Sequence, residues 1–244
     1  MRNTTHAVYL YTQCEGAPLK TIDRRSLRTR LALRDALAQE IHATGDLARV
    51  RVTNVTERAD VTRRTFYSHY KDIPALVSAI EDEILVELAP LAYDISQVTL
   101  PELEEAIRSF GPCPGSERVL AYFRANGQIL SALLGEGGDP AFVEKIKDMV
   151  REVVQSRALD GYSALALPVF DYYLTFVISA EVGVLVRWLT TGMQESDKAM
   201  ACIMTSLMFV RPGDLYGRPI EFDIPSVSAA VQDCSKELDH GTNR

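Results

Sequence analysis

The sequence VTNVTERADVTRRTFYSHY, residues 52–70, predicts two short helices joined by a tight turn. Thr53 is expected to cap the first helix, and Thr62 is expected to cap a second helix that reaches about Tyr70. Asp60 falls at the turn, where aspartate can adopt the left-handed backbone conformation at modest cost. Two short helices in this arrangement form a helix-turn-helix, a motif that places its second helix in the major groove of DNA.

Apolar spacing predicts helices on both sides of this motif. Leu33, Leu37 and Ile41 recur on one helix face, and Gly45 is expected to end that helix. Another helix is expected to start after Asp72 and to end at Pro90. Further helices are expected over residues 101–110, 116–134, 139–158, 168–191 and 196–210, with Ser116, Asp139 and Ser196 as caps. Strand signals are almost absent, so the sequence predicts an all-α fold.

The charge is distributed unevenly along the chain. The whole chain of 244 residues has a formal net charge of −7. Residues 20–74 carry 12 Lys and Arg against 7 Asp and Glu, a net charge of +5, so the remainder carries −12. A basic N-terminal third on an acidic body is typical of a nucleic-acid-binding module attached to a second domain.

Composition favours a globular cytoplasmic protein. Hydrophobic residues make up 47% of the chain and charged residues 24%, which excludes a disordered or fibrous protein. The longest apolar run, around Phe176–Trp188, is interrupted by Glu181 and Arg187, so no membrane partner is expected. The N-terminal apolar stretch is too short for a signal peptide. The four Cys and four His are scattered, so we expect neither a metal site nor a cofactor.

The stretch from about Asp23 to Leu88 resembles the DNA-binding signature of the TetR family of transcriptional regulators. The likeness is carried by residues 52–70, with their Thr-Phe-Tyr-x-His-aromatic run, and by the helix that ends in Gly45. Asp60 stands where the family usually has glycine. The resemblance implies an N-terminal three-helix DNA-binding domain with a helix-turn-helix, followed by a larger helical domain that binds a ligand and dimerises.

The expected domain boundaries follow from this division. They are a lead-in at 1–22, a DNA-binding domain at 23–72, a ligand-binding and dimerisation domain at 73–211, and an irregular tail at 212–244.

Candidate DNA contacts follow from position in the motif. Arg63 and Arg64 start the second helix, from which side chains reach base edges and Arg can bond to guanine O6 and N7. With Thr62 they are the candidates for reading bases. The candidates for contacting phosphates are Thr53, Tyr67, His69, Lys71, Arg25 and Arg28.

Each candidate also has a simpler interpretation. Arg63 and Arg64 could be an ordinary solvated helix face, and Tyr67 could pack against the first helix. His69 could form only a local hydrogen bond. The arginines near residues 24–30 could be no more than a soluble helix start.

The remainder of the chain predicts a pocket and a dimer interface, as the resemblance implies for the family. Aromatic candidates for the pocket are Tyr122, Phe123, Phe170, Tyr173 and Trp188, although aromatic residues at helical spacing are more often core. Two apolar C-terminal helices favour pairing with a second copy over burial within a monomer. The interface candidates are Val184, Arg187, Trp188, Met200, Ile203, Met204 and Leu207.

The leading hypothesis is a homodimeric regulator, specifically a repressor, that binds a palindromic double-stranded DNA operator and senses a small-molecule effector. The alternative is a TetR-like protein-interaction subunit or coregulator that has lost DNA binding, which Arg63, Arg64 and the local positive charge disfavour. An enzyme is the third alternative. No catalytic motif supports an enzyme, so none is expected.

Overall fold

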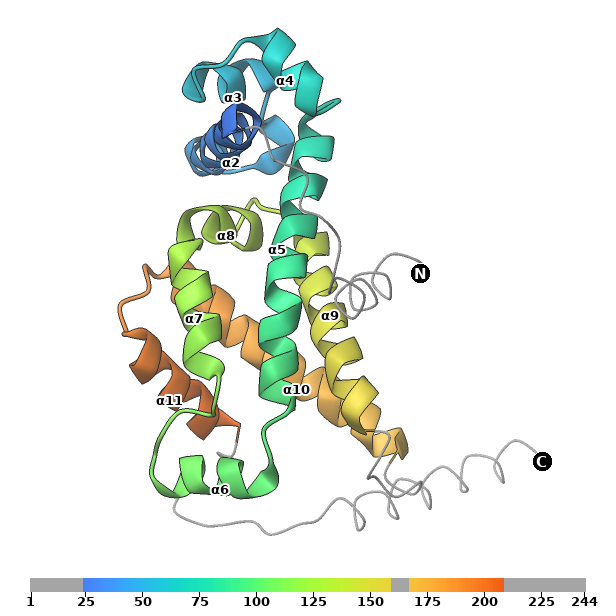
Figure 1. Ribbon diagram of the computed structural model, residues 1–244, viewed down its shortest axis with the longest axis vertical. Helices are drawn as coiled ribbons and strands as arrows, with labels where there is room; N and C mark the ends of the chain where they lie inside the picture. Colours follow the sequence, from blue (N-terminus) through green and yellow to red (C-terminus); the bar gives the residue numbers. More distant parts are fainter. Residues whose placement is uncertain (1–23, 159–166, 209–244) are drawn as a thin grey trace, which may run out of the picture.

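The computed structural model describes residues 24–158 and 167–208, and every regular element in these ranges is helical. The helices form a small N-terminal group and a larger body, with one long helix shared between them (Figure 1). Their bounds are α2 (Arg24–Thr44), the short 3₁₀ helix η1 (Leu47–Arg49), α3 (Val52–Arg58), α4 (Arg63–His69), α5 (Ile73–Ser96), α6 (Leu100–Arg108), α7 (Ser116–Ala125), α8 (Gly127–Leu134), α9 (Pro140–Ala158), α10 (Leu167–Thr190) and α11 (Asp197–Leu207). The all-α prediction is confirmed.

The N-terminal group, α2 to α4, forms one end of the molecule (Figure 1). Its interior is built from the apolar positions that the sequence marks: Leu33 and Leu37 of α2, Val55 of α3 and Phe66 of α4 are each 0% exposed. Gly45 ends α2 with φ +66°, a conformation that glycine adopts without steric cost. Packing around these side chains leaves the opposite face of α4 toward solvent.

Helix α5 runs from the N-terminal group through the length of the body (Figure 1). The Asp72 side chain accepts a hydrogen bond from the Ala75 amide at 2.8 Å and caps its start, as the sequence predicts. The predicted end at Pro90 is wrong, because the helix continues to Ser96. Proline removes one backbone hydrogen bond, but burial of Leu88 and Ala89 holds this part of the helix on the core.

Two other predicted caps and one predicted helix are also wrong. Thr53 lies inside α3, whose N-cap is Arg51, and Gly115 rather than Ser116 precedes α7. The single helix predicted over 116–134 is divided at Asn126 into α7 and α8. Gly127, which follows the break, is buried so closely that an added Cβ would lie 2.5 Å from the Met193 Cε atom. Helices α7 and α8 run in different directions on the two sides of this break (Figure 1).

The other predicted caps hold. Asp139 accepts a hydrogen bond from the Ala141 amide at 2.8 Å before α9, and Ser196 accepts one from the Ala199 amide at 3.2 Å before α11. Both caps supply acceptors for amides that lack a partner within the first helical turn.

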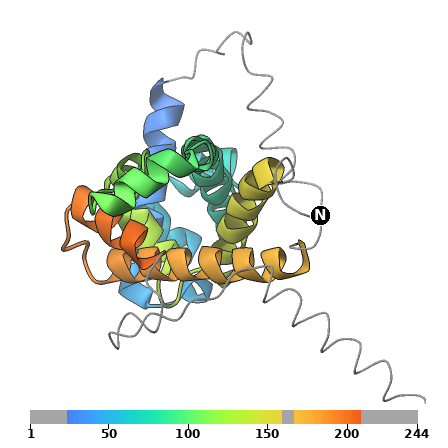
Figure 2. The same cartoon turned by 90° about the horizontal axis from the view of Figure 1, so that it is seen from below.

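Helices α5 and α7 to α11 surround the interior of the body (Figures 1 and 2). Viewed from below in Figure 2, α10 runs along one side of this body. Over Asp171–Thr190 α10 is long and apolar enough to cross a membrane, with a mean hydropathy of 1.4, and 28% of that stretch is buried. A helix so apolar and so little covered leaves apolar side chains exposed.

The N-terminal group meets the body through backbone as well as side-chain contacts. The Leu47 amide donates a hydrogen bond to the Gly137 carbonyl at 2.7 Å, and the Arg34 guanidinium donates one to the Asn126 Oδ1 at 2.7 Å. A Cβ at Gly137 would lie 2.0 Å from the Gly45 carbonyl oxygen, so the two loops approach closely enough to require glycine.

Candidate functional site

The exposed face of α4 carries the predicted base-reading residues. The Thr62 side chain accepts a hydrogen bond from the Thr65 amide at 3.1 Å and so caps α4. Arg63 and Arg64 occupy the first turn of α4 and are exposed. Neither forms an ion pair within the described parts of the chain. Both guanidinium groups are therefore available to an external hydrogen-bond acceptor.

The turn before α4 fixes the direction in which that helix projects. The Val61 amide donates to the Thr56 carbonyl at 3.0 Å, closing the turn after α3. Asp60 has φ +50°, the left-handed conformation expected at this position. The buried Phe66 ring then anchors α4, with the rings of Tyr67 and Tyr70 at centroid distances of 5.5 Å and 6.0 Å.

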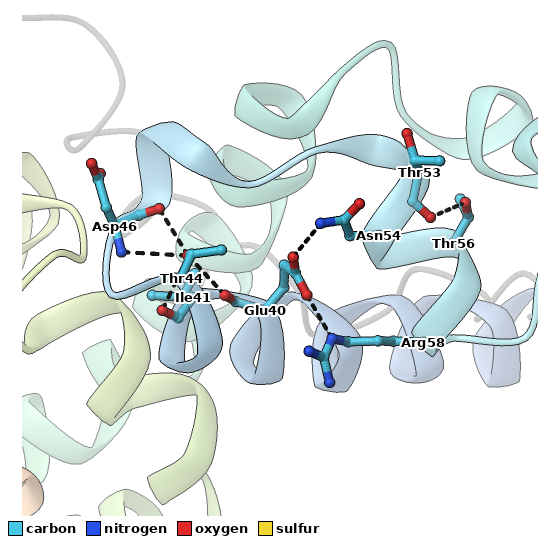
Figure 3. A network of polar contacts seen from close by, with 8 residues as sticks. All are labelled: Glu40, Ile41, Thr44, Asp46, Thr53, Asn54, Thr56 and Arg58. Carbon is cyan, nitrogen blue, oxygen red and sulfur yellow. Dashed lines mark hydrogen bonds and ion pairs between the residues drawn. The ribbon is translucent and has the colours of Figure 1, made fainter.

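A buried carboxylate joins α3 to α2. Glu40 is 3% exposed and accepts hydrogen bonds from the Asn54 Nδ2 at 2.5 Å and the Arg58 Nε at 2.6 Å (Figure 3). The bond from Asn54 lowers the pKa of Glu40, and Arg58 lowers it further against the opposing effect of burial. Because Asn54 and Arg58 lie one helical turn apart, this Glu40 clamp fixes the position of α3 on α2.

The residues predicted to contact phosphates differ in how far their side chains are exposed. Tyr67 is 58% exposed, so it is not packed against α2 as its simpler interpretation required. Lys71 is also exposed, whereas His69 is partly buried and stacks near Tyr70 with ring centroids 6.1 Å apart. The side chain of Thr53 extends away from α2 (Figure 3).

Internal ion pairs remove several basic residues from the set available to DNA. Arg58 bonds to Glu40, Arg30 pairs with Glu83 of α5, and Arg49 lies 3.4 Å from Asp46. Arg25 and Arg28 are exposed on the first turns of α2. The positive charge of the N-terminal group is therefore partly structural, whereas Arg63 and Arg64 on α4 have no ion pair in the described ranges.

A cavity of about 380 Å³ lies within the body. Its walls include Phe123 and Tyr173 of the predicted pocket residues. Tyr122 and Trp188 are not part of its walls, which corrects the prediction for both. Tyr122 instead donates a hydrogen bond to Glu87 at 2.8 Å, and Trp188 is 2% exposed beneath the Arg124 guanidinium, 5.0 Å from the ring centroid. The side chain of Phe170 lies outside the described part of the structure.

The predicted interface residues divide between surface and core. Ile203 and Leu207 of α11 are 40% and 47% exposed, and Arg187 of α10 is also exposed. Val184 and Met204 are partly buried. Trp188 and Met200 are 2% and 4% exposed, so both side chains are already buried within the single chain. Helical periodicity did not distinguish the inner face of these apolar helices from the outer face.

Helix α9, which lines the cavity, is tied to α5 by an ion pair. The Lys145 Nζ lies 2.6 Å from the Oε2 of Glu81, which is 1% exposed. Burial raises the pKa of Glu81 above its usual value, although Lys145 opposes this effect. A second cavity of about 490 Å³ lies beside this pair, between η1 and the body.

Two carboxylates with defined roles were not recognised from the sequence. Glu40 lies in a helix whose neighbouring residues read only as an amphipathic face, and its partners are 14 and 18 residues away. Glu181 appeared only as an interruption of an apolar run, yet it lines the 380 Å³ cavity. A lone carboxylate within an apolar helix is the signal that could have identified Glu181.

Comparisons with known proteins agree with this architecture. Residues 112–209 match the family model TetR_C_8, described as the C-terminal region of transcriptional regulators. A stretch of 91 residues, 36% of the chain, is 30% identical to the uncharacterized HTH-type transcriptional regulator YxbF of Bacillus subtilis (strain 168). The chain spans about a quarter of that protein's length, 24%.

A solved structure shows the same fold. The TetR transcriptional regulator from Streptococcus agalactiae 2603V superposes with a TM-score of 0.50 and 23% sequence identity, covering 76% of this chain and 96% of that one. Both this chain and that structure place a helix-turn-helix at the N-terminus and a larger helical domain after it. In these comparisons the chain is similar to TetR-type transcriptional regulators.

The Glu40 clamp predicts a pH-dependent contribution to stability. Replacing Glu40 with Ala removes two hydrogen bonds, one of them from a charged donor, and is expected to lower the free energy of unfolding by about 2–3 kcal/mol at pH 7. Because folding lowers the pKa of Glu40, its contribution is present above the unfolded-state pKa and is lost as pH falls through the folded-state value. Urea unfolding at pH 7 and in acid measures both effects.

The control for this prediction is Glu57→Ala. Glu57 is exposed on α3 and carries the same charge as Glu40, but it does not accept the hydrogen bonds from Asn54 and Arg58. Equal unfolding free energies for the two variants at pH 7 would show that the clamp does not stabilise α3.

Proposed function

We propose that this chain is a homodimeric transcriptional repressor of the cytoplasm that reads a palindromic operator through α4 and responds to a small-molecule effector in its helical body. The observation that carries the proposal is the exposed pair Arg63 and Arg64 on a short helix fixed from behind by buried Phe66. Arg at the start of a recognition helix can form two hydrogen bonds to guanine, which discriminates this base from the others.

Positioning on DNA is assigned to the residues at the edges of α4. Tyr67, Lys71 and the Thr53 hydroxyl offer donors to phosphate oxygens, and such contacts set orientation and affinity rather than sequence preference. His69 is partly buried, so its proposed contact uses only the exposed edge of the ring. Arg25 and Arg28 would add phosphate contacts from the start of α2.

A second copy of the chain is proposed to cover the apolar outer surfaces of α10 and α11. Tyr172 and Phe176 of α10 are 77% and 72% exposed, and Ile203 and Leu207 of α11 add apolar side chains. Apolar surface of this kind on a regulator marks an interaction site, and a two-fold dimer covers the same surface on both copies. Two recognition helices related in this way would read half-sites about 34 Å apart.

Repression is the proposed direction of regulation. A dimer held on its operator excludes other proteins from that DNA. An effector that binds the cavity between α5, α9 and α10 would shift the tilt of α5, whose first residue follows α4 by a short link. The effector can change the affinity for DNA only to the extent that it binds one orientation of α5 more tightly than the other.

The base-reading assignment predicts a specific loss in DNA binding. With a duplex selected from random sequence by the purified chain, Arg63→Ala or Arg64→Ala should cost about 1–3 kcal/mol and relax the preference at one base position per half-site. Lys71→Ala should weaken selected and random duplexes alike. Competition binding at fixed salt measures the ratio of the affinities for the selected and the random duplex. Arg118→Ala, a body variant with the same loss of charge, serves as control, and an unchanged ratio in both α4 variants would contradict the assignment.

The dimer assignment predicts that one charge on α10 dissociates the protein. Phe176→Glu would place a carboxylate in the proposed apolar interface, where it has no partner, while the single chain keeps its fold because Phe176 is 72% exposed. Light scattering should give the mass of two 27.1 kDa chains for the natural protein and of one chain for this variant. Val86→Glu makes the same kind of change at an exposed position of α5 and should stay dimeric. A natural protein with the mass of one chain at micromolar concentration would refute the proposal.

A further inference from the structure

The 380 Å³ cavity of the body has almost entirely apolar walls. Helices α5, α7, α8, α9, α10 and α11 all contribute to it, with Leu88, Phe123, Met149, Ile178 and Met204 among the lining side chains. At about 30 Å³ for each group of the size of a water molecule, this volume accommodates roughly a dozen non-hydrogen atoms. The cavity therefore fits an elongated or compact apolar molecule of modest size.

Among the described residues that line the cavity, Glu181 is the only carboxylate, and none is a lysine, arginine or histidine. It lies on α10 and has no hydrogen bond or ion pair with any residue in the described ranges 24–158 and 167–208. Glu181 is partly buried, and an ionised carboxylate against apolar walls without a partner is unfavourable, so the site lacks a complementary donor. This is the opposite of Glu40 and Glu81, which both have cationic partners within the chain.

The groups around Glu181 do not supply that donor. The lining residues from α5, α7, α8, α9 and α11 are uncharged, and Tyr173 is the other titratable residue in the walls. The Cys113 thiol lies near enough to respond to Glu181, and its pKa is raised by burial, by Glu181 and by Glu102. Cys113 therefore stays a neutral thiol at neutral pH and adds no positive charge.

We infer that the cavity binds an apolar cation, a small lipophilic amine whose ammonium group bonds to the carboxylate of Glu181 while its hydrocarbon part fills the cavity. This inference rests on the proposed effector site and names the chemical class of its ligand. An anionic ligand would meet a like charge in a medium of low dielectric constant. A neutral hydrocarbon that filled the cavity would shield the carboxylate from water without giving it a partner.

The protonation state of Glu181 gives the inference a pH signature. Burial raises the pKa of Glu181 to about 7. An alkylammonium ion stays charged well above this pH, since amines of this type resemble lysine with a pKa of about 10. The ammonium group binds the ionised form of the carboxylate, so the affinity for the amine should rise as pH increases through 7. A neutral ligand of the same length should not show this rise.

The test compares three ten-carbon probes on the purified full-length chain by titration calorimetry: decylammonium, decanol and decanoate, each below its micelle-forming concentration. At pH 8.5 the natural protein should bind decylammonium about tenfold or more tightly than decanol, as a charged hydrogen bond requires, and decanoate most weakly. Between pH 8.5 and 5.5 the affinity for decylammonium should fall by about 30-fold, if only ionised Glu181 binds it.

Glu181→Gln should remove the preference for decylammonium over decanol and its pH dependence, because the amide keeps the shape and loses the charge. Glu144→Gln is the matched control, since Glu144 is on α9, pairs with Lys147 on the surface and does not line the cavity. The pH dependence of the natural protein tests the same point without any substitution.

The possible failures separate the two proposals. If decanol or decanoate binds as tightly as decylammonium at pH 8.5, or if Glu181→Gln keeps the preference, the assignment of a cationic ligand is overturned while the cavity remains a ligand site. If none of the three probes binds the natural protein, the cavity is not the effector site, and the sensing part of the proposed function is overturned with it.

Discussion

Helix α5 is the structural constraint on which the rest of the molecule depends. It starts at Ile73, after the short link that follows the end of α4 at His69, and it continues without interruption to Ser96 inside the body. The Asp72 cap fixes its start, and the buried row through Leu76, Ile80 and Ile84 packs it into the core. A change in the tilt of α5 is therefore expected to move α4, because only three residues link the two helices.

The two ends of α5 meet groups of different chemistry. At the N-terminal end, the Glu40 clamp and the close approach of Gly45 and Gly137 hold α2, α3 and the body in contact. Along the body, Glu81 bonds to Lys145 of α9, and the far turns of α5 form part of the wall around Glu181. A ligand that compensates the charge of Glu181 would act on the same helices that support α4, and this gives the proposed sensing a physical route to the DNA-reading face.

The sequence predicts the elements of the N-terminal group well because local signals and burial agree there. Gly45 and the caps Thr62 and Asp72 mark helix ends through backbone chemistry that operates within a few residues. The prediction fails where tertiary packing overrides a local signal: Pro90 reads as a helix end, yet packing of the core carries α5 through it. Trp188 shows why site residues are harder to predict from sequence. Its apolar character and helical spacing are visible in the sequence, but only the fold shows that its side chain faces inward.

The most direct test of the account is thermodynamic linkage between the cavity and α4. The affinity of the purified protein for decylammonium is measured at pH 8.5 with and without a saturating selected duplex, and its affinity for the duplex is measured with and without decylammonium. The account predicts that each ligand changes the affinity for the other by the same factor, about 5- to 150-fold. Decylammonium that binds with equal affinity to the free and the DNA-bound protein would contradict it.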